Sequence, residues 1–229
     1  FKTDIGAENI MYVHVTLVPY IQAAQELKTK PTQHSVKALR EIGIQPDLLL
    51  CRSAQNLPES VRRKIALFCD VRNDAVFTAQ NVEYIYRVPL LYHEEGVDQR
   101  ILDFFKLDGG HAADLSEWQA IVERLHAPAY SVNIGIVGKY VELQDAYKSM
   151  IEALIHGGIA NQAKVVLHWI DAEDIEQKGA AAILGEMDGI LVPGGFGKRG
   201  AEGKIEAVRY AREQKAPFFG LCLGLQCAV

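Results

Sequence analysis

The sequence has 229 residues, of which 49% are hydrophobic and 23% are charged, and its formal net charge is -5. This ordinary globular composition excludes a disordered chain, a basic surface for nucleic acid and an acidic tail. No apolar run approaches the roughly 20 residues of a bilayer span, and the four cysteines show no CxxC spacing, so we expect a soluble protein of the reducing cytoplasm without a membrane or nucleic-acid partner.

Both ends of the sequence suggest an incomplete chain. Residue 1 is Phe, the first methionine is Met11, and residues 224–229 look like the opening turn of a helix. We therefore expect the sequence to be a piece of a longer one.

The first half of the sequence alternates short apolar runs with segments of helical periodicity. Residues 10–18 are rich in β-branched side chains, whereas Val36, Leu39 and Ile42 recur at helical spacing. The pattern predicts strands at 10–18, 47–51 and 75–79 and helices at 33–42, 58–69 and 97–105. Strands that alternate with helices favour a parallel sheet.

The alternation lapses over residues 109–131, which we expect to be a linker that includes a connecting helix at 115–125. A second alternation then begins. It predicts strands at 132–138, 164–170, 188–192 and 217–221 and helices around 147–154 and 205–208. The predicted fold class is therefore α/β, with two parallel-sheet α/β domains at residues 1–108 and 132–229.

The clearest chemical signal is a Gly-x-Cys-x-Gly pattern formed by Gly220, Cys222 and Gly224. It follows a buried strand and precedes an apparent helix, as the nucleophile does in a strand-to-helix elbow. Small residues on both sides allow a sharp turn, and backbone N–H groups at a helix start favour the reactive thiolate. The alternative is a buried cysteine at a strand end punctuated by glycines.

A glycine-rich loop supports the catalytic interpretation. Residues 188–200, DGILVPGGFGKRG, end a strand with consecutive glycines, whose N–H groups can approach a ligand closely. Together with the N–H of Leu223, this loop can donate to an oxyanion that forms under thiolate attack. A turn that only needs positive φ is the alternative.

The second domain offers no convincing base for such a thiol. A cysteine nucleophile normally needs a histidine oriented by a carboxylate. The histidines available are His156, near the end of a helix, and His168, inside a strand. We interpret both as structural or surface residues.

The segment KTKPTQHSV in the first domain has the features of a polyphosphate-binding site. Lys28 and Lys30 bracket a turn, Pro31 suits a helix start, and Thr32 or Ser35 could cap that helix. Ammonium groups and free N–H donors would then converge on one place. A solvated basic turn is the alternative.

Three further positions have a functional and a structural interpretation. Arg52 follows the 47–51 strand, where parallel sheets bind ligands, but an exposed surface arginine is the alternative. Lys64 lies beside an apolar helix stripe and could reach a phosphate or simply extend its head into solvent. In the 196–202 segment, an aromatic side chain followed by two basic ones could stack on a base and pair with phosphate, or form a flexible charged loop.

Several segments together resemble one family. VNIGIVGKYVELQDAYKSMIEAL, LVPGGFGKRGAEGK and FGLCLGLQ resemble the class I glutamine amidotransferase half of the CTP synthase family, and VTLVPYIQAAQELKTKPTQHSV and LLLCRS resemble the end of its synthetase half, a P-loop-type amidoligase domain. The resemblance covers essentially the whole sequence. KTKPTQHSV discriminates best, because many class I amidotransferases share the elbow.

The resemblance implies an enzyme that hydrolyses glutamine, passes the ammonia to a second site and there aminates UTP to CTP with ATP. It implies Mg²⁺ with ATP, activation by GTP, feedback inhibition by CTP and a homotetramer. Cys222 would form a γ-glutamyl thioester, the N–H groups of Gly195 and Leu223 would stabilise the oxyanion, and Gln226 would help to hold glutamine.

The resemblance also assigns nucleotide sites. UTP phosphates, and CTP in an overlapping site, would be bound by Lys28, Lys30, Gln33 and Lys64. ATP would contact Arg52 and the Asn81–Val82 position, and activation by GTP would involve Phe196, Arg199, Gly200 and Glu202.

The same resemblance places the general-base histidine and its glutamate partner after Val229, and the phosphate-binding loop and magnesium carboxylates before Phe1. We therefore expect that these 229 residues alone do not make CTP. Two other functions stay open: a class I amidotransferase of a different synthetase, and a noncatalytic nucleotide-sensing or assembly module.

Overall fold

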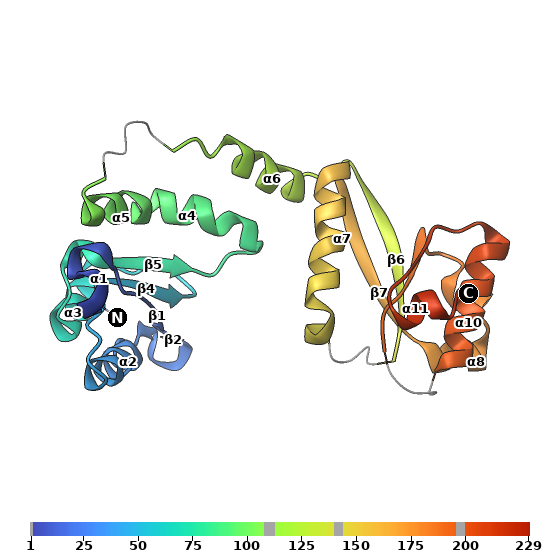
Figure 1. Cartoon of the computed structure of the whole chain (residues 1–229), viewed down its shortest axis with the longest axis horizontal. Coiled ribbons are helices and arrows are strands. Elements are labelled where there is room, and N and C mark those ends of the chain that lie inside the picture. The colour runs from blue at the N-terminus through green and yellow to red at the C-terminus, as the bar shows by residue number, and fades with distance from the viewer. Residues whose placement is uncertain (1, 108–112, 140–143, 196–199) are drawn as a thin grey trace. The chain divides into compact units, whose positions relative to one another are not determined.

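The computed structural model describes residues 2–107, 113–139, 144–195 and 200–229 (Figure 1). The chain forms two compact units, residues 1–122 and 123–229. The boundary between them falls inside helix α6 (Ser116–His126).

The first unit is built on a three-stranded parallel sheet in the order β1-β4-β5. Its strands are β1 (Val13–Leu17), β4 (Leu48–Ser53) and β5 (Val76–Gln80). Its longer helices are α2 (Lys30–Glu41), α3 (Glu59–Cys69), α4 (Val88–Glu94) and α5 (Val97–Phe105), and its smaller elements are α1 (Lys2–Ile5) and the antiparallel pair β2 (Tyr20–Ile21) and β3 (Glu26–Leu27).

Alternating side chains of β4 separate the core of this unit into two layers. Leu49 packs on one face of the sheet with Val36 of α2 and Ile65 of α3. Leu48 packs on the other face with Phe77 and with Val97 of α5. Because successive strand residues point to opposite faces, a run of apolar residues is needed when helices cover both faces.

The second unit has a four-stranded parallel sheet in the order β7-β6-β8-β9. Its strands are β6 (Tyr130–Gly138), β7 (Ala163–Asp171), β8 (Gly189–Val192) and β9 (Phe218–Gly220). Its helices are α7 (Lys148–Asn161), α8 (Ala172–Lys178), α9 (Ala180–Leu184), α10 (Ala201–Gln214) and α11 (Leu223–Gln226).

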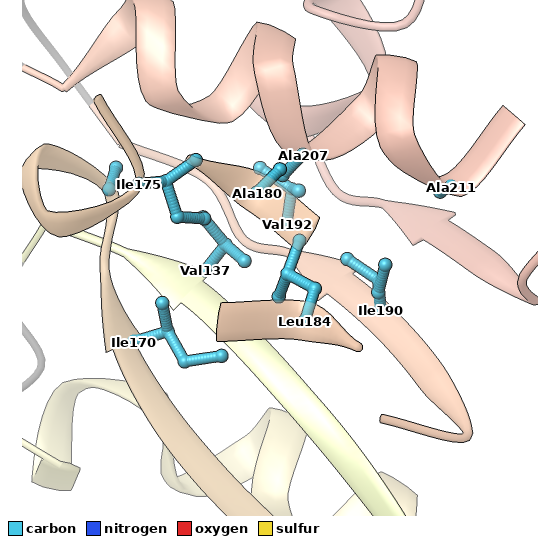
Figure 2. Close-up of a cluster of buried hydrophobic side chains, with 10 residues drawn as sticks. Val137, Ile170, Ile175, Ala180, Leu184, Ile190, Val192, Ala207 and Ala211 are labelled. Atoms are coloured by element: carbon cyan, nitrogen blue, oxygen red, sulfur yellow. The ribbon is translucent and has the colours of Figure 1, made fainter. Parts of the chain in front are cut away.

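Helices also cover both faces of this second sheet. On one face, Val137 and Val192 pack with Ile175 of α8, Leu184 of α9 and Ala207 of α10 (Figure 2). On the other face, Met150 of α7 packs against strand residues of β6 and β8. The sheet therefore holds the carboxyl ends of β8 and β9 in a fixed frame.

The structure confirms the predicted α/β class with parallel sheets, and each predicted strand is present with ends that differ by up to three residues. Helices α4, α8 and α9 were not expected from the sequence. The expected cap of α2 is wrong: Thr29 occupies the N-cap position, while Thr32 donates its hydroxyl to Leu17 O and Ser35 bonds to His14. None of the helices in the described parts of the chain has the length and apolar character of a bilayer span.

Helices α8 and α10 approach so closely that only glycine fits between them. A Cβ atom added to Gly203 would lie 1.8 Å from the carbonyl oxygen of Ala172. We therefore expect Gly203→Ala to lower the free energy of unfolding of the second unit by about 2 kcal/mol, as overpacking does. Thermal or urea unfolding measures the change.

Gly157→Ala in α7 is the matched control, because a Cβ atom at Gly157 would meet nothing within 4 Å. This change should leave the stability unchanged or raise it by up to about 1 kcal/mol, since alanine has the higher helix propensity. Equal effects of the two substitutions would contradict the proposed helix contact.

Candidate active site

Cys222 lies in a tight bend between β9 and α11, where the glycine pattern predicts it. Its backbone has φ 50° and ψ -107°, a conformation that is unfavourable for a residue with a Cβ atom. The thiol is exposed. The bend therefore exposes the Cys222 thiol at a position where a regular strand or helix would not.

Two glycines allow this bend to pack against β8. A Cβ atom on Gly224 would lie 2.0 Å from Val192 O, and one on Gly220 would lie 2.6 Å from Gly224 C. The N–H of Leu221 donates to the same Val192 O at 2.9 Å. The spacing of the glycines thus follows from two close backbone contacts.

The glycine loop after β8 lies beside the thiol. A Cβ atom on Gly194 would lie 3.3 Å from Cys222 Cβ and 3.9 Å from its Sγ, and one on Gly195 would lie 3.9 Å from Leu223 Cδ2. Among the described residues, neither the N–H of Gly195 nor that of Leu223 has a hydrogen-bond acceptor. Two free donors therefore occur next to a candidate nucleophile, as an oxyanion site requires.

A buried lysine completes this cluster. Lys204 on the first turns of α10 is 1% exposed, and its Nζ would lie 3.3 Å from a Cβ atom on Gly195. Burial lowers the pKa of its ammonium group, the thiol of Cys227 raises it, and the ammonium of Lys139 lowers it. The site therefore includes a buried basic side chain that the sequence pattern did not point to.

The cysteines of the first unit have a different character. Cys51 and Cys69 are buried, and burial raises the pKa of Cys51 to about 12 and that of Cys69 to about 11. Their thiolate forms are therefore scarce at neutral pH, so neither thiol should be reactive in the folded protein.

Neither histidine that the sequence offers as a base stands out in the structure. His156 is exposed on α7. His168 on β7 is hydrogen-bonded through Nε2 to Asn133 Oδ1 at 2.9 Å. Strand β7 is one edge strand of the sheet, whereas Cys222 follows the other edge strand, β9. We keep the interpretation of both as structural or surface residues.

The remaining predicted residues of the second unit lie near the same edge. Gln226 is exposed on α11, and its N–H donates to Cys222 O at 3.1 Å. Gly200 has φ 71° and precedes α10, whose first turn carries the exposed Glu202. Phe196 and Arg199 lie outside the described residues.

In the first unit, the predicted ATP residues come together at the carboxyl ends of the strands. Arg52 Nη2 donates to Asn81 Oδ1 at 2.9 Å, and Val82 follows half-buried. Arg52 and Asn81 line a hollow of about 830 Å³, together with Leu17, Tyr20 and Ser35. Parallel sheets bind ligands at this edge.

The predicted UTP residues are only partly gathered. Lys28 forms an ion pair with Glu26, and the pKa of Glu26 is lowered by its hydrogen bond with Lys28, by the Lys28 charge and, more weakly, by Lys64. Two of the four predicted side chains therefore lie near one carboxylate. The side chains of Lys28 and Lys64 are exposed, so packing against neighbouring side chains does not fix their positions.

Lys30 and Gln33 lie on the first turn of α2. Lys30 is exposed, and Gln33 Nε2 donates to Thr29 Oγ1 at 3.0 Å. Gln33 also lines a groove of about 510 Å³ with residues that include Lys37 and Phe68. This groove is distinct from the hollow beside Arg52.

Within the described residues, no group of three His, Cys, Asp or Glu side chains is placed to hold a metal ion.

Glu26 and Lys204 are not among the residues that the sequence pointed to. A signal for Lys204 existed, since Lys204, Ala207 and Ala211 follow one another at i, i+3 and i+7, which places the lysine on the buried stripe of α10. Glu26 had no such signal, because its relation to Lys64 depends on how β3 and α3 are placed.

Comparisons with known proteins match both units. The family described as CTP synthase N-terminus matches residues 1–107, and the family described as glutamine amidotransferase class-I matches residues 142–229. The CTP synthase of Syntrophus aciditrophicus is 56% identical over 229 residues, which are 100% of this chain and 42% of that protein. The CTP synthase of Rhizorhabdus wittichii is 58% identical over 229 residues, which are 99% of this chain and 42% of that protein.

The chain thus spans about two fifths of the length of the curated relatives it matches. Among solved structures, the glutaminase domain of Trypanosoma brucei CTPS with bound acivicin is 42% identical, with a TM-score of 0.40, over 43% of this chain and 39% of that one.

The difference between the thiols predicts a labelling order. Iodoacetamide at about pH 7.5 should modify the exposed Cys222 first, because the reactive species is an accessible thiolate. Cys51 and Cys69 should react only after the protein unfolds, since both are buried and have raised pKa values. Peptide mass spectrometry over time measures the order, and rapid native labelling of Cys51 would contradict it.

Proposed function

Because the chain belongs to the CTP synthase family, we propose that its two units serve glutamine-dependent formation of CTP. The second unit would carry the thiol that releases ammonia from glutamine. The first unit would contribute to the ATP-dependent amination of UTP.

The observation that carries this proposal is the bend at Cys222 with free N–H groups beside it. The thiolate sulfur would attack the carbonyl carbon of the glutamine side-chain amide, and a carbon–sulfur bond would form as the carbonyl oxygen becomes negative. The C–N bond would then break, so that ammonia leaves with an added proton and a γ-glutamyl thioester remains. Water would hydrolyse the thioester to glutamate and regenerate the thiol.

The loop and the bend would stabilise the tetrahedral intermediate of this reaction. The N–H groups of Gly195 and Leu223 have no acceptor among the described residues, and a Cβ atom on Gly195 would lie 3.9 Å from Leu223 Cδ2. Donors that are fixed before the charge appears favour the transition state over the substrate. Gln226 would help to hold the substrate on the exposed side of α11.

The nucleotide assignments belong to the same proposal. Lys28 and Lys64 would bind the UTP triphosphate in place of Glu26, with Lys30 and Gln33 at the start of α2, and CTP would inhibit by overlapping this site. Arg52 and the Asn81–Val82 position would contact ATP in the hollow that they line or adjoin. Gly200 and Glu202, with Phe196 and Arg199, would mediate activation by GTP.

We also propose cytoplasmic location and assembly into a homotetramer, both of which rest on the family resemblance.

A class I amidotransferase of a different synthetase is disfavoured by the match of residues 1–107 to the CTP synthase N-terminus. A noncatalytic sensor is the other alternative. It should not react at Cys222 with a glutamine-like electrophile, whereas an amidotransferase should.

The role of the thiol predicts a selective loss. In the full-length protein, Cys222→Ala should lower glutamine-dependent CTP formation by at least about 1,000-fold, because no other group can form the thioester. Formation of CTP from free ammonia should persist, because ammonia bypasses the thiol.

Cys227→Ala is the control, since Cys227 is half-buried five positions further on and has no part in the proposed reaction. Steady-state assays with glutamine and with ammonium chloride measure both activities. Parallel loss of the two activities in Cys222→Ala would show that Cys222 does not have this separate role.

The phosphate role of Lys64 predicts weaker binding of UTP. Lys64→Met should raise the KM for UTP by about tenfold, which corresponds to the loss of one charge-assisted contact of about 1.4 kcal/mol. Arg63→Met removes an exposed charge from the neighbouring position, where Arg63 Nε pairs with Glu59 at 2.9 Å. An equal effect of the two substitutions would contradict a phosphate site at Lys64.

A further inference from the structure

Lys204 has no part in the steps described above, although it is among the largest fully buried side chains of the protein. A charged group out of water is costly unless its surroundings compensate for it. The described groups that act on the pKa of Lys204 are a thiol and a second ammonium, those of Cys227 and Lys139, and neither is a carboxylate. Its position therefore calls for a functional explanation.

The glycine loop is the closest candidate for a partner. A Cβ atom on Gly195 would lie 3.3 Å from Lys204 Nζ, whereas a Cβ atom on Gly194 would lie 3.3 Å from Cys222 Cβ. Consecutive loop residues thus lie next to the ammonium and the thiol. Gly195 also carries one of the N–H groups that have no acceptor among the described residues.

The start of α10 holds the lysine in this position. Gly203 packs directly on the carbonyl of Ala172, and its N–H donates to Glu176 Oε1 at 3.0 Å. The N–H of Lys204 donates to Gly200 O at 3.3 Å. The carboxylate of Glu176 is therefore engaged by the backbone of α10, and the lysine stem extends from a fixed turn toward the loop.

We propose that Lys204 is a positioning residue of the Cys222 site, whose ammonium supports the Gly194–Gly195 loop and supplies positive charge where the substrate carbonyl oxygen becomes negative. This inference rests on the proposed hydrolysis of glutamine. A fixed charge away from water is screened less than an exposed one, so it favours the charged intermediate. Lys204 forms no bond to substrate and transfers no proton in this role.

Two reactions of the same thiol separate this role from a structural one. Hydrolysis of glutamine by the full-length protein passes through an oxyanion, whereas alkylation of Cys222 by iodoacetamide displaces iodide and forms none. A change that only disturbs the bend should slow both reactions. Loss of the positive charge beside the oxyanion should slow hydrolysis more than alkylation, because a nearby ammonium also favours the thiolate.

The test compares Lys204→Met with Lys204→Arg. We expect Lys204→Met to lower kcat for glutamine hydrolysis by about 10- to 100-fold, less than the loss of a direct oxyanion donor. KM for glutamine should stay nearly unchanged, and the alkylation rate should fall less than kcat. Lys204→Arg keeps the charge and should recover part of kcat. All variants carry Cys227→Ser, so that Cys222 is the single thiol between residues 216 and 229.

Lys164→Met is the matched control. Lys164 is an exposed lysine near the start of β7, at the opposite edge of the same sheet. This variant removes the same charge from the same unit and should hydrolyse glutamine normally. A Lys204→Met protein with normal kcat, or with hydrolysis and alkylation slowed equally, would overturn the inference.

A second variant tests the contact without changing the lysine. Gly195→Ala places a methyl group 3.3 Å from the position of Nζ, which should shift the ammonium by a few tenths of an ångström. If the two residues act together, kcat of the double variant Gly195→Ala with Lys204→Met should fall less than the product of the single losses. Independent losses that multiply would overturn the inference.

The same measurements distinguish failure of the inference from failure of the proposed function. If the protein with an intact Lys204 alkylates normally but does not hydrolyse glutamine, the proposed function fails and this inference fails with it. If that protein hydrolyses glutamine and Lys204→Met hydrolyses it equally well, only the role of Lys204 fails.

Discussion

The carbonyl oxygen of Val192, at the carboxyl end of β8, fixes the place where the chain bends around Cys222. It accepts the N–H of Leu221 at 2.9 Å, and Gly224 lies so close that a Cβ atom there would be 2.0 Å away. Because β8 lies inside a sheet covered by helices on both faces, this oxygen cannot move without disturbing the core. The bend, the thiol and the glycine loop all take their positions from it.

Both units place their chemistry at the carboxyl ends of parallel strands, but with different degrees of order. Cys222 lies in a bend fixed by close backbone contacts, and the buried Lys204 lies next to Gly195. Lys28 and Lys64 instead have exposed side chains near Glu26. A rigid frame suits a reaction in which charge develops within one small group. An open set of long side chains suits a flexible, highly charged ligand that brings its own counter-charges.

The sequence predicted what depends on local pattern and missed what depends on packing between distant segments. Strand β6 and the glycine spacing around Cys222 were predictable, because apolar alternation and small residues mark them directly. Helices α8 and α9 were not, since Ala172 to Leu184 holds few large apolar residues and their packing arises from α10 and β7. The burial of Lys204 depends on Gly203 meeting the Ala172 carbonyl, a contact that no single segment encodes.

The positive φ of Cys222 places selection for a stable fold in conflict with selection for a reactive thiol. Glycine adopts this conformation without the steric cost that a Cβ atom imposes, so a glycine at position 222 would make a more robust fold while removing the sulfur. A thiol persists at such a place only as long as its chemistry is needed. In a lineage that no longer needs the thiol, substitution of Cys222 by glycine would be an early and recognisable sign of the lost chemistry.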